Sequence, residues 1–365
     1  MTAPITRIEA EHIPTLQAGA QLLACGTGGG DWLVLSEWLR VVIERNGPLT
    51  VAQPEDLDPE GACAAVHMVG SPMLMEEQLP TGGELRLAIE ALQRWTGREL
   101  TAIAPLNAAG PNALIPMIAA AELGLPLLDL DGMGRIFPLV DMTTYALGGL
   151  APTPITLTGT AGEVILLDGP AGRLEGQLRP ALLGCGGWAC CASYPGTIGQ
   201  FAATGIPGSV SRVLHAGRVL RREHGLAEDG FARQLGGRSL AVGQIVDVER
   251  HQTDRTWTDG SFPAGPSSVI IGESGGHGRM IRLEIHNDIL LALADGGVIA
   301  SVPDGICLVS GIDRQPVDVE QLQLGMRVEV LVLPAASAWR SEAGMAVAGP
   351  AAFGLAHHVP TGLPR

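Results

Sequence analysis

The stretch LTAIAPLNAAGPNALIPMIAAAELGLPLLDLDG, residues 100–132, contains the clearest signal of the fold. Its first part, residues 100–107, is a short apolar run that predicts a strand. Residues 112–124 predict an apolar helix closed by Gly124, and residues 125–132 predict a second strand. A strand, a helix and a strand joined by short loops are typical of an α/β layer with a largely parallel sheet.

The same alternation extends through the first 150 residues, with predicted helices at 8–24, 32–45 and 82–97 and a strand at 61–70. From about Ser239 the apolar segments shorten, and DG, GG and GID turns separate them, which favours antiparallel strands. We therefore predict an N-terminal α/β domain over residues 1–160 and a β-rich domain with helical inserts over residues 161–365. We expect the ligand cleft at or near their junction.

Composition excludes several classes of partner. The net charge is −15, so neither nucleic acid nor an anionic membrane surface is an expected partner. The small apolar residues at 113–128 are interrupted by Pro116, Glu122 and Pro126, which indicates a helix and a strand rather than a membrane span. The first residues lack the basic and apolar regions of a signal peptide. The six cysteines show no C-x-x-C spacing, and we expect a reduced, cytoplasmic protein.

The sequence contains no lysine, and all 23 basic residues are arginine. This excludes a lysine Schiff base and therefore ordinary pyridoxal phosphate chemistry. It also excludes a phosphate-binding loop of the GK[ST] kind, so we expect no nucleotide cofactor.

A glycine-rich turn, CGTGGGDW at residues 25–32, separates two predicted helices. Consecutive glycines are costly in conformational entropy, and free amides at a helix start favour an anion or a polarised carbonyl. We therefore predict that the turn contacts substrate, through Thr27, Gly28, Gly29, Gly30 and Asp31. Asp31 is equally consistent with a helix cap, and Cys25 with a small buried apolar residue.

Polar side chains also follow the predicted strands, at the edge where ligands collect in an open parallel sheet. The candidates are His67, Asn107, Asn112, Asp129, Asp131 and Arg135. A lone histidine in an apolar strand is by default a satisfied core residue, and asparagines beside glycine and proline commonly bond their own turns. The two aspartates are the hardest to explain structurally, because buried carboxylates need partners.

Two further groups of residues favour a structural interpretation. Cys190 and Cys191 are adjacent on a predicted strand, so their side chains alternate between its faces and core packing is preferred. His357 and His358 lie near the C-terminus, where adjacent histidines are most simply solvent-facing.

The order of motifs resembles the S-methyl-thiohydantoin desulfurase family, formerly a domain of unknown function associated with hydantoinases and oxoprolinases. The similar segments include ACGTGGGD, VGSPM and LNAAGPNALIPMIAAAELGLPLLDLDGMGRIFPLVDMTTYALGG, followed by SVSRVLHAGRVL, GQIVDVER and IRLEIHNDILLALADG. The resemblance covers nearly the whole chain. The chain departs from the family pattern at Trp32, which follows Asp31, and at His286, Asn287 and Asp288.

The resemblance implies a hydrolase-like desulfurase that replaces sulfur by oxygen on a thiohydantoin-like five-membered ring and releases sulfide or a thiol. Such a reaction needs an activated water, donors for the tetrahedral anion and help for the leaving sulfur. A divalent metal, with zinc the first choice, would supply part of this, with His67, Asp129 and Asp131 as candidate ligands or general bases. The amides of Gly28, Gly29 and Gly30 would hold the ring oxygen or the developing anion. Arg135 would pair with a carboxylate of the substrate.

Two alternatives remain open at the level of sequence. In a metal-free version, Cys25 is the nucleophile and His67 its base, because a helix start lowers the pKa of a thiol. In the other, the chain is a non-catalytic subunit of a hydantoinase or oxoprolinase-type partner, and the glycine turn is only structural. We expect a homo-oligomer in either case.

Overall fold

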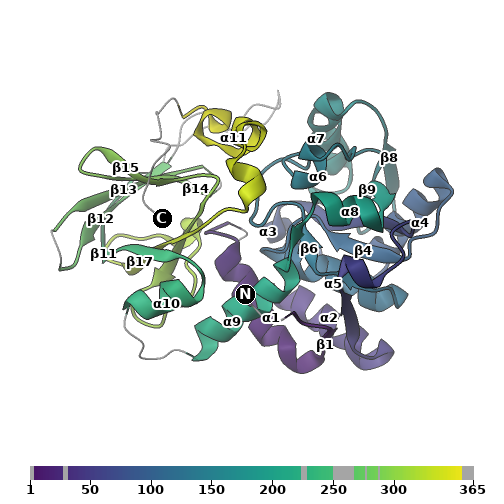
Figure 1. Cartoon of the computed structure of the whole chain (residues 1–365), viewed down its shortest axis with the longest axis horizontal. Coiled ribbons are helices and arrows are strands. Elements are labelled where there is room, and N and C mark those ends of the chain that lie inside the picture. The colour runs from purple at the N-terminus through teal and green to yellow at the C-terminus, as the bar shows by residue number, and fades with distance from the viewer. Residues whose placement is uncertain are drawn as a thin grey trace. The chain divides into compact units, whose positions relative to one another are not determined.

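The computed structural model describes residues 4–27, 32–222, 228–249, 267–275, 278–286 and 288–355. The chain forms two compact units. Unit 1 comprises Met1–Ala20 and Gly28–His215, and unit 2 comprises Gln21–Thr27 and Ala216–Arg365. The segment before the glycine turn therefore belongs to unit 2. Figure 1 shows the elements of each unit.

Unit 1 is built on an eight-stranded sheet with the order β1-β2-β5-β4-β3-β9-β7-β8. Its centre is parallel, because β5 pairs in parallel with β2 and β4, and β4 with β3. The flanking strands are antiparallel. The strands are Arg7–Ile8 (β1), Leu49–Ala52 (β2), Ala62–Gly70 (β3), Ala102–Pro105 (β4), Leu127–Leu128 (β5), Ile155–Thr158 (β7), Val164–Leu167 (β8) and Trp188–Thr197 (β9).

Helices join and cover these strands. They are Ile13–Leu23 (α1), Leu33–Asn46 (α2), Pro72–Glu77 (α3), Glu84–Thr96 (α4), Pro111–Leu123 (α5), Thr144–Leu147 (α6), Leu174–Gly184 (α7), Ile198–Thr204 (α8) and Ser209–Arg222 (α9). Helix α4 is amphipathic and packs its buried leucine, isoleucine and alanine side chains against β7 and β9. Helix α5 is buried almost throughout and packs against β3 and β4 as well as against α2.

The predicted α/β class is confirmed, since β4, α5 and β5 form the strand–helix–strand unit expected from residues 100–132. One detail differs. The single strand predicted over residues 125–132 is two short strands, β5 and Leu130–Asp131 (β6). After Leu128 the chain leaves the large sheet, and β6 pairs with Ile206–Pro207 (β10) in a separate two-stranded ribbon.

Unit 2 contains a seven-stranded antiparallel sheet with the order β15-β14-β13-β12-β11-β17-β16, which confirms the predicted β-rich domain. The strands are Arg238–Glu249 (β11), Ser267–Glu273 (β12), Met280–Ile285 (β13), Ile289–Ala294 (β14), Gly297–Ser301 (β15), Gly305–Ser310 (β16) and Arg327–Leu333 (β17). Helices Glu228–Gln234 (α10) and Glu342–Ala348 (α11) flank them in the chain. Isoleucine, leucine and valine side chains that alternate along the strands form one core.

The predicted domain boundary near residue 160 and the predicted cleft at the domain junction stay predictions, although compact unit 1 continues to His215. None of the helices in the described part of the chain is long and apolar enough to cross a membrane.

Candidate functional site

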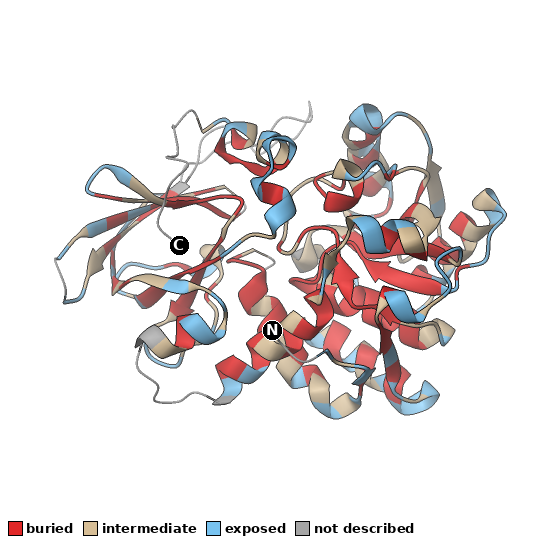
Figure 2. Cartoon of the chain, in the orientation of Figure 1, coloured by how far each residue is buried: buried red, intermediate tan, exposed pale blue. Residues whose placement is uncertain are grey.

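The carboxyl ends of β3, β4 and β5 lie at one edge of the unit 1 sheet, as expected for parallel neighbours. Most of the predicted polar residues follow these strands. His67, Asn107, Asp129, Asp131 and Arg135 are all buried, within the strongly buried centre of the unit seen in Figure 2. Because an unpaired buried polar group is costly, the partners of each side chain indicate its role.

Asp131 binds three separate segments of the chain. Its Oδ2 accepts the N–H of Ala108 at 2.7 Å, and both oxygens accept the N–H of Gly134 at 3.0 and 3.1 Å. Oδ1 also accepts the hydroxyl of Ser209, the first residue of α9, at 2.9 Å. Each carboxylate oxygen thus has two donors. Asp131 therefore fixes the loop after β4 and the turn after β6 to the start of α9.

Burial raises the pKa of Asp131 to about 6, and the hydrogen bonds from Ala108, Ser209 and Gly134 oppose that shift. The carboxylate is ionised at neutral pH, as its four accepted contacts require.

Asp129, two residues earlier and between β5 and β6, has a similar set of contacts. Its Oδ1 accepts the N–H of Ser211 at 3.0 Å, and its Oδ2 accepts the Ser211 hydroxyl at 2.5 Å and the Gln53 amide at 3.2 Å. Its backbone N–H donates to Ala52, and its carbonyl accepts the N–H of Gly208. Asp129 therefore joins β2 to the first turn of α9.

These contacts leave the two aspartates unsuited to the predicted metal site. The carboxylate oxygens already accept N–H and O–H donors, which a metal ion would have to displace. His67 makes its own contacts, and among the described residues no group of three histidine, cysteine, aspartate or glutamate side chains lies close enough to hold a metal ion. The donor set of His67, Asp129 and Asp131 does not fit zinc.

His67 is fully buried in the middle of β3. Its Nε2 lies 2.9 Å from the Ser193 hydroxyl on β9, and its Nδ1 lies 3.4 Å from the Met68 carbonyl. Burial lowers the pKa of His67 to about 4, so the imidazole is neutral at pH 7. These contacts give both ring nitrogens of the buried histidine a hydrogen-bond partner. They also place a neutral imidazole beside the Ser193 hydroxyl.

Asn112, in the first turn of α5, bonds the end of β3. Its Oδ1 accepts the N–H of Met68 at 2.7 Å, and its Nδ2 donates to the Met68 carbonyl at 3.2 Å. These paired bonds continue the backbone pattern of the sheet with a side chain, so Asn112 holds the helix start against the strand.

Asn107 differs from all of these residues. Only 2% of its surface is exposed, and its Nδ2 makes one contact, 3.5 Å from the sulfur of Met133. Its Oδ1 is buried and has no hydrogen-bond partner within the described part of the chain. The next residue, Ala108, is held by Asp131. Among the described residues, the structure thus places a buried hydrogen-bond acceptor without a partner at the carboxyl edge of the sheet.

Arg135 follows the turn that Asp131 fixes, and only 4% of its surface is exposed. Its guanidinium carbon lies 5.3 Å from the centre of the Phe137 ring, within the range of a cation–π contact. Asn107, Met133 and Arg135 therefore belong to two neighbouring loops that Asp131 bonds together.

The remaining predicted residues belong to the glycine turn. Gly28, Gly29, Gly30 and Asp31 lie outside the described residues. Cys25 and Thr27 belong to unit 2, and Cys25 is buried, with its Sγ 3.4 Å from the Leu23 carbonyl. The predicted base for Cys25, His67, belongs to unit 1, so their pairing stays a prediction.

Sequence reasoning missed Ser193, Ser209 and Ser211. Ser209 and Ser211 are 78 and 82 residues from the aspartates that they bond, and Ser193 is 126 residues from His67. The serines at the start of α9 had one local signal, because serine is preferred at helix N-termini.

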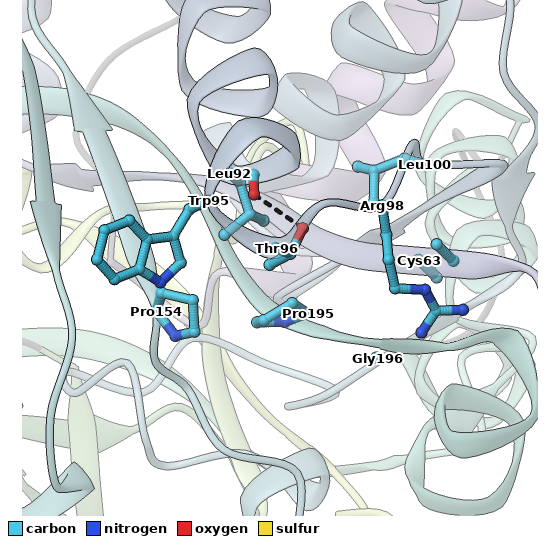
Figure 3. A pocket seen from close by; sticks show the side chains of 10 residues that line it. Cys63, Leu92, Trp95, Thr96, Arg98, Leu100, Pro154, Pro195 and Gly196 are labelled. Carbon is cyan, nitrogen blue, oxygen red and sulfur yellow. Dashed lines mark hydrogen bonds between the residues drawn. The ribbon is translucent and has the colours of Figure 1, made fainter.

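A cavity of about 320 Å³ lies at the opposite edge of the same sheet, where β3 begins. In Figure 3, Trp95 and Pro154 lie on one side of it and Arg98 on the other. Its lining includes none of the predicted site residues. The cavity is therefore separate from the polar cluster at the carboxyl edge.

Comparisons with known proteins give one family and one fold. A family model described as S-Me-THD-like, N-terminal domain, matches residues 11–169, and the corresponding C-terminal domain model matches residues 170–361. A search among curated proteins found no match. A crystal structure of a protein from Chromobacterium violaceum is similar, with a TM-score of 0.77 and 21% identity over 99% of this chain and 100% of that chain. At this identity the likeness shows the fold alone.

Proposed function

This chain belongs to the S-Me-THD-like family, the S-methyl-thiohydantoin desulfurase family that its motifs resemble, and from that membership we infer that it hydrolyses a carbon–sulfur bond of a thiohydantoin-like ring. Water adds to the sulfur-bearing carbon of the five-membered ring, and the sulfur leaves as sulfide or, from an S-methyl substrate, as methanethiol. The ring carbon becomes a carbonyl, so the products are a hydantoin and a sulfur compound.

The observation that best supports this proposal is the unsatisfied acceptor of Asn107. A hydantoin-type ring presents N–H groups in its plane, and an amide oxygen is a natural partner for one of them. Substrate binding would supply the hydrogen bond that Oδ1 lacks in the described chain. A site built to bond a substrate N–H discriminates strongly against ligands without one, because its buried acceptor is then left unpaired.

Asp131 acts on this site indirectly. Its bond to Ala108 holds the residue after Asn107, and its bonds to Gly134 hold the residue before Arg135. We assign Asp131 the role of a positioning residue that keeps the Asn107 acceptor and the Arg135 guanidinium in fixed positions relative to each other. Arg135 then provides positive charge for a substrate carboxylate or for the anion formed when water adds.

The remaining steps fall to residues predicted from sequence. The amides of Gly28, Gly29 and Gly30 are proposed to hold the ring carbonyl or the tetrahedral anion. His67 is neutral at pH 7, the state that a general base requires, and its contact with Ser193 offers a route for a proton.

The test is an assay of the purified full chain with a 2-thiohydantoin and its S-methyl derivative in isotopically labelled water. We expect release of sulfide from the first and methanethiol from the second, with one labelled oxygen in each hydantoin product. If the folded protein releases neither, the desulfurase proposal is wrong, and a non-catalytic role beside a hydantoinase-type partner becomes the better account.

A further inference from the structure

Two thiols of unit 2 lie in direct contact. The Sγ atoms of Cys25 and Cys307 are 3.3 Å apart without a disulfide between them, and both residues are buried, with 2% and 1% of their surfaces exposed. Cys25 is the first residue of the glycine-rich turn, and Cys307 lies in β16. The other four cysteines, Cys63, Cys185, Cys190 and Cys191, belong to unit 1. Cys25 and Cys307 are 282 residues apart in the chain, so their contact joins two distant segments.

The surroundings hold Cys25 in this position. Gly305 leaves room for its sulfur, because a Cβ at Gly305 would lie 2.8 Å from Sγ. The next residue, Gly26, has a φ of 85° and accepts the N–H of Val319 at 3.0 Å. A Cβ there would lie 2.9 Å from a methyl group of Val319. Two close approaches and a backbone bond thus place this segment against β16 and the short 3-10 helix Val319–Gln321.

The opposite thiol is held as well. The Sγ of Cys307 lies 3.3 Å from the Leu22 carbonyl, which also accepts the backbone N–H of Cys25 at 3.1 Å. Both sulfurs are therefore positioned by the same turn at the end of α1. To form a bond of about 2.05 Å, they would have to move about 1.3 Å closer.

We propose that Cys25 and Cys307 are an oxidative modification site, a dithiol that closes to a disulfide with a peroxide as the oxidant. Each thiol loses one proton and one electron, the two sulfurs bond, and hydrogen peroxide accepts both electrons and both protons to become two molecules of water. A small-molecule dithiol reduces the bond back to two thiols by thiol–disulfide exchange and is itself oxidised to a disulfide. The disulfide covalently links the start of the glycine-rich turn to β16.

The test uses the reduced full-length protein under native conditions. It is treated with hydrogen peroxide, alkylated, digested without reduction and analysed by mass spectrometry. We expect a peptide pair linked through Cys25 and Cys307, formed before any other cysteine is oxidised and lost on reduction. The thermal midpoint should also rise by several degrees on oxidation, because the link closes a long loop in the unfolded chain.

Matched variants separate this site from general thiol oxidation. Cys307→Ser and Cys307→Ala should show no link and no rise in thermal midpoint, whereas Cys190→Ser should behave like the unsubstituted chain. The mapping on the unsubstituted protein tests the proposal even if a variant fails to fold. If peroxide leaves Cys25 and Cys307 reduced while the chain is folded, or links either to a different cysteine, the proposal is wrong.

Discussion

The two units differ in how many polar side chains they bury. Unit 2 has an apolar core between antiparallel strands, and its buried polar side chains in the described residues are Ser268, Asp288, Ser301 and Glu329. Unit 1 buries many more, among them a histidine, an asparagine, two aspartates and an arginine at one edge of its sheet. Burying such groups is costly unless they are bonded. Their concentration at one edge is the reason that the proposed site is placed in unit 1.

The hydrogen-bond partners of these side chains separate them into two groups. Asp129, Asp131, Asn112 and His67 bond backbone or hydroxyl groups of the same unit. Asn107 alone among these five has a buried oxygen without a partner in the described chain. We therefore infer that Asp129, Asp131 and Asn112 hold the scaffold, whereas Asn107 binds a ligand.

The largest effect is expected when Asp131 is replaced by asparagine. An amide in place of the carboxylate turns one acceptor into a donor that faces N–H and O–H donors. We expect Asp131→Asn to lower the free energy of unfolding by about 3 kcal/mol, because hydrogen bonds to a buried carboxylate are lost and a buried donor is left facing other donors. Urea unfolding measures the change. The exposed Asp56 offers a control, since Asp56→Asn should leave stability unchanged. A stable variant that loses only activity would instead support the catalytic role suggested by the sequence.

The next effect concerns pH and His67. The folded chain keeps His67 neutral down to a pKa of about 4, whereas the unfolded chain protonates it below about 6.5. Protons therefore favour unfolding between these values, so the contribution of His67 to stability is present above pH 6.5 and is lost as pH falls toward 4. From pH 7 to pH 5 this loss amounts to about 2 kcal/mol.

Urea unfolding of His67→Gln at several pH values tests this. The unsubstituted chain should lose about 2 kcal/mol more than the variant between pH 7 and pH 5. Asp131 acts in the opposite direction, because its pKa is raised to about 6, but it is present in both proteins and cancels in the difference. Parallel pH profiles would show that His67 is not buried in its neutral form.

A smaller effect is expected at Asn112. Asn112→Ala removes two hydrogen bonds to the backbone of Met68 and should lower the free energy of unfolding by about 1.5 kcal/mol. Asn46 is a matched control, because its side chain makes one bond, to the Ala121 carbonyl. Asn46→Ala should cost less than Asn112→Ala. An equal or reversed order would contradict the scaffold role of Asn112.

The sequence was sufficient for much of the fold because apolar periodicity and helix-ending glycines are local signals. Residues 100–132 predicted β4, α5 and the return strand from such signals. The division of that strand into β5 and β6 was not predictable, because it depends on pairing with β10, more than seventy residues later. The position of Asn107 after a strand identified it as a candidate. That its Oδ1 lacks a partner among the described residues depends on how the loops of distant segments pack around it.

The most direct test of the central claim replaces Asn107 by leucine, which has a similar volume and no polar atom. Because a buried acceptor without a partner in the described chain costs free energy, Asn107→Leu should keep its stability or gain about 1 kcal/mol. At the same time kcat/KM for a thiohydantoin should fall about 10²-fold or more, since a substrate N–H loses its acceptor. Both are measured on one preparation, by urea unfolding and by sulfide release. The account predicts a stable, inactive variant, and a destabilised variant with unchanged kcat/KM would contradict it.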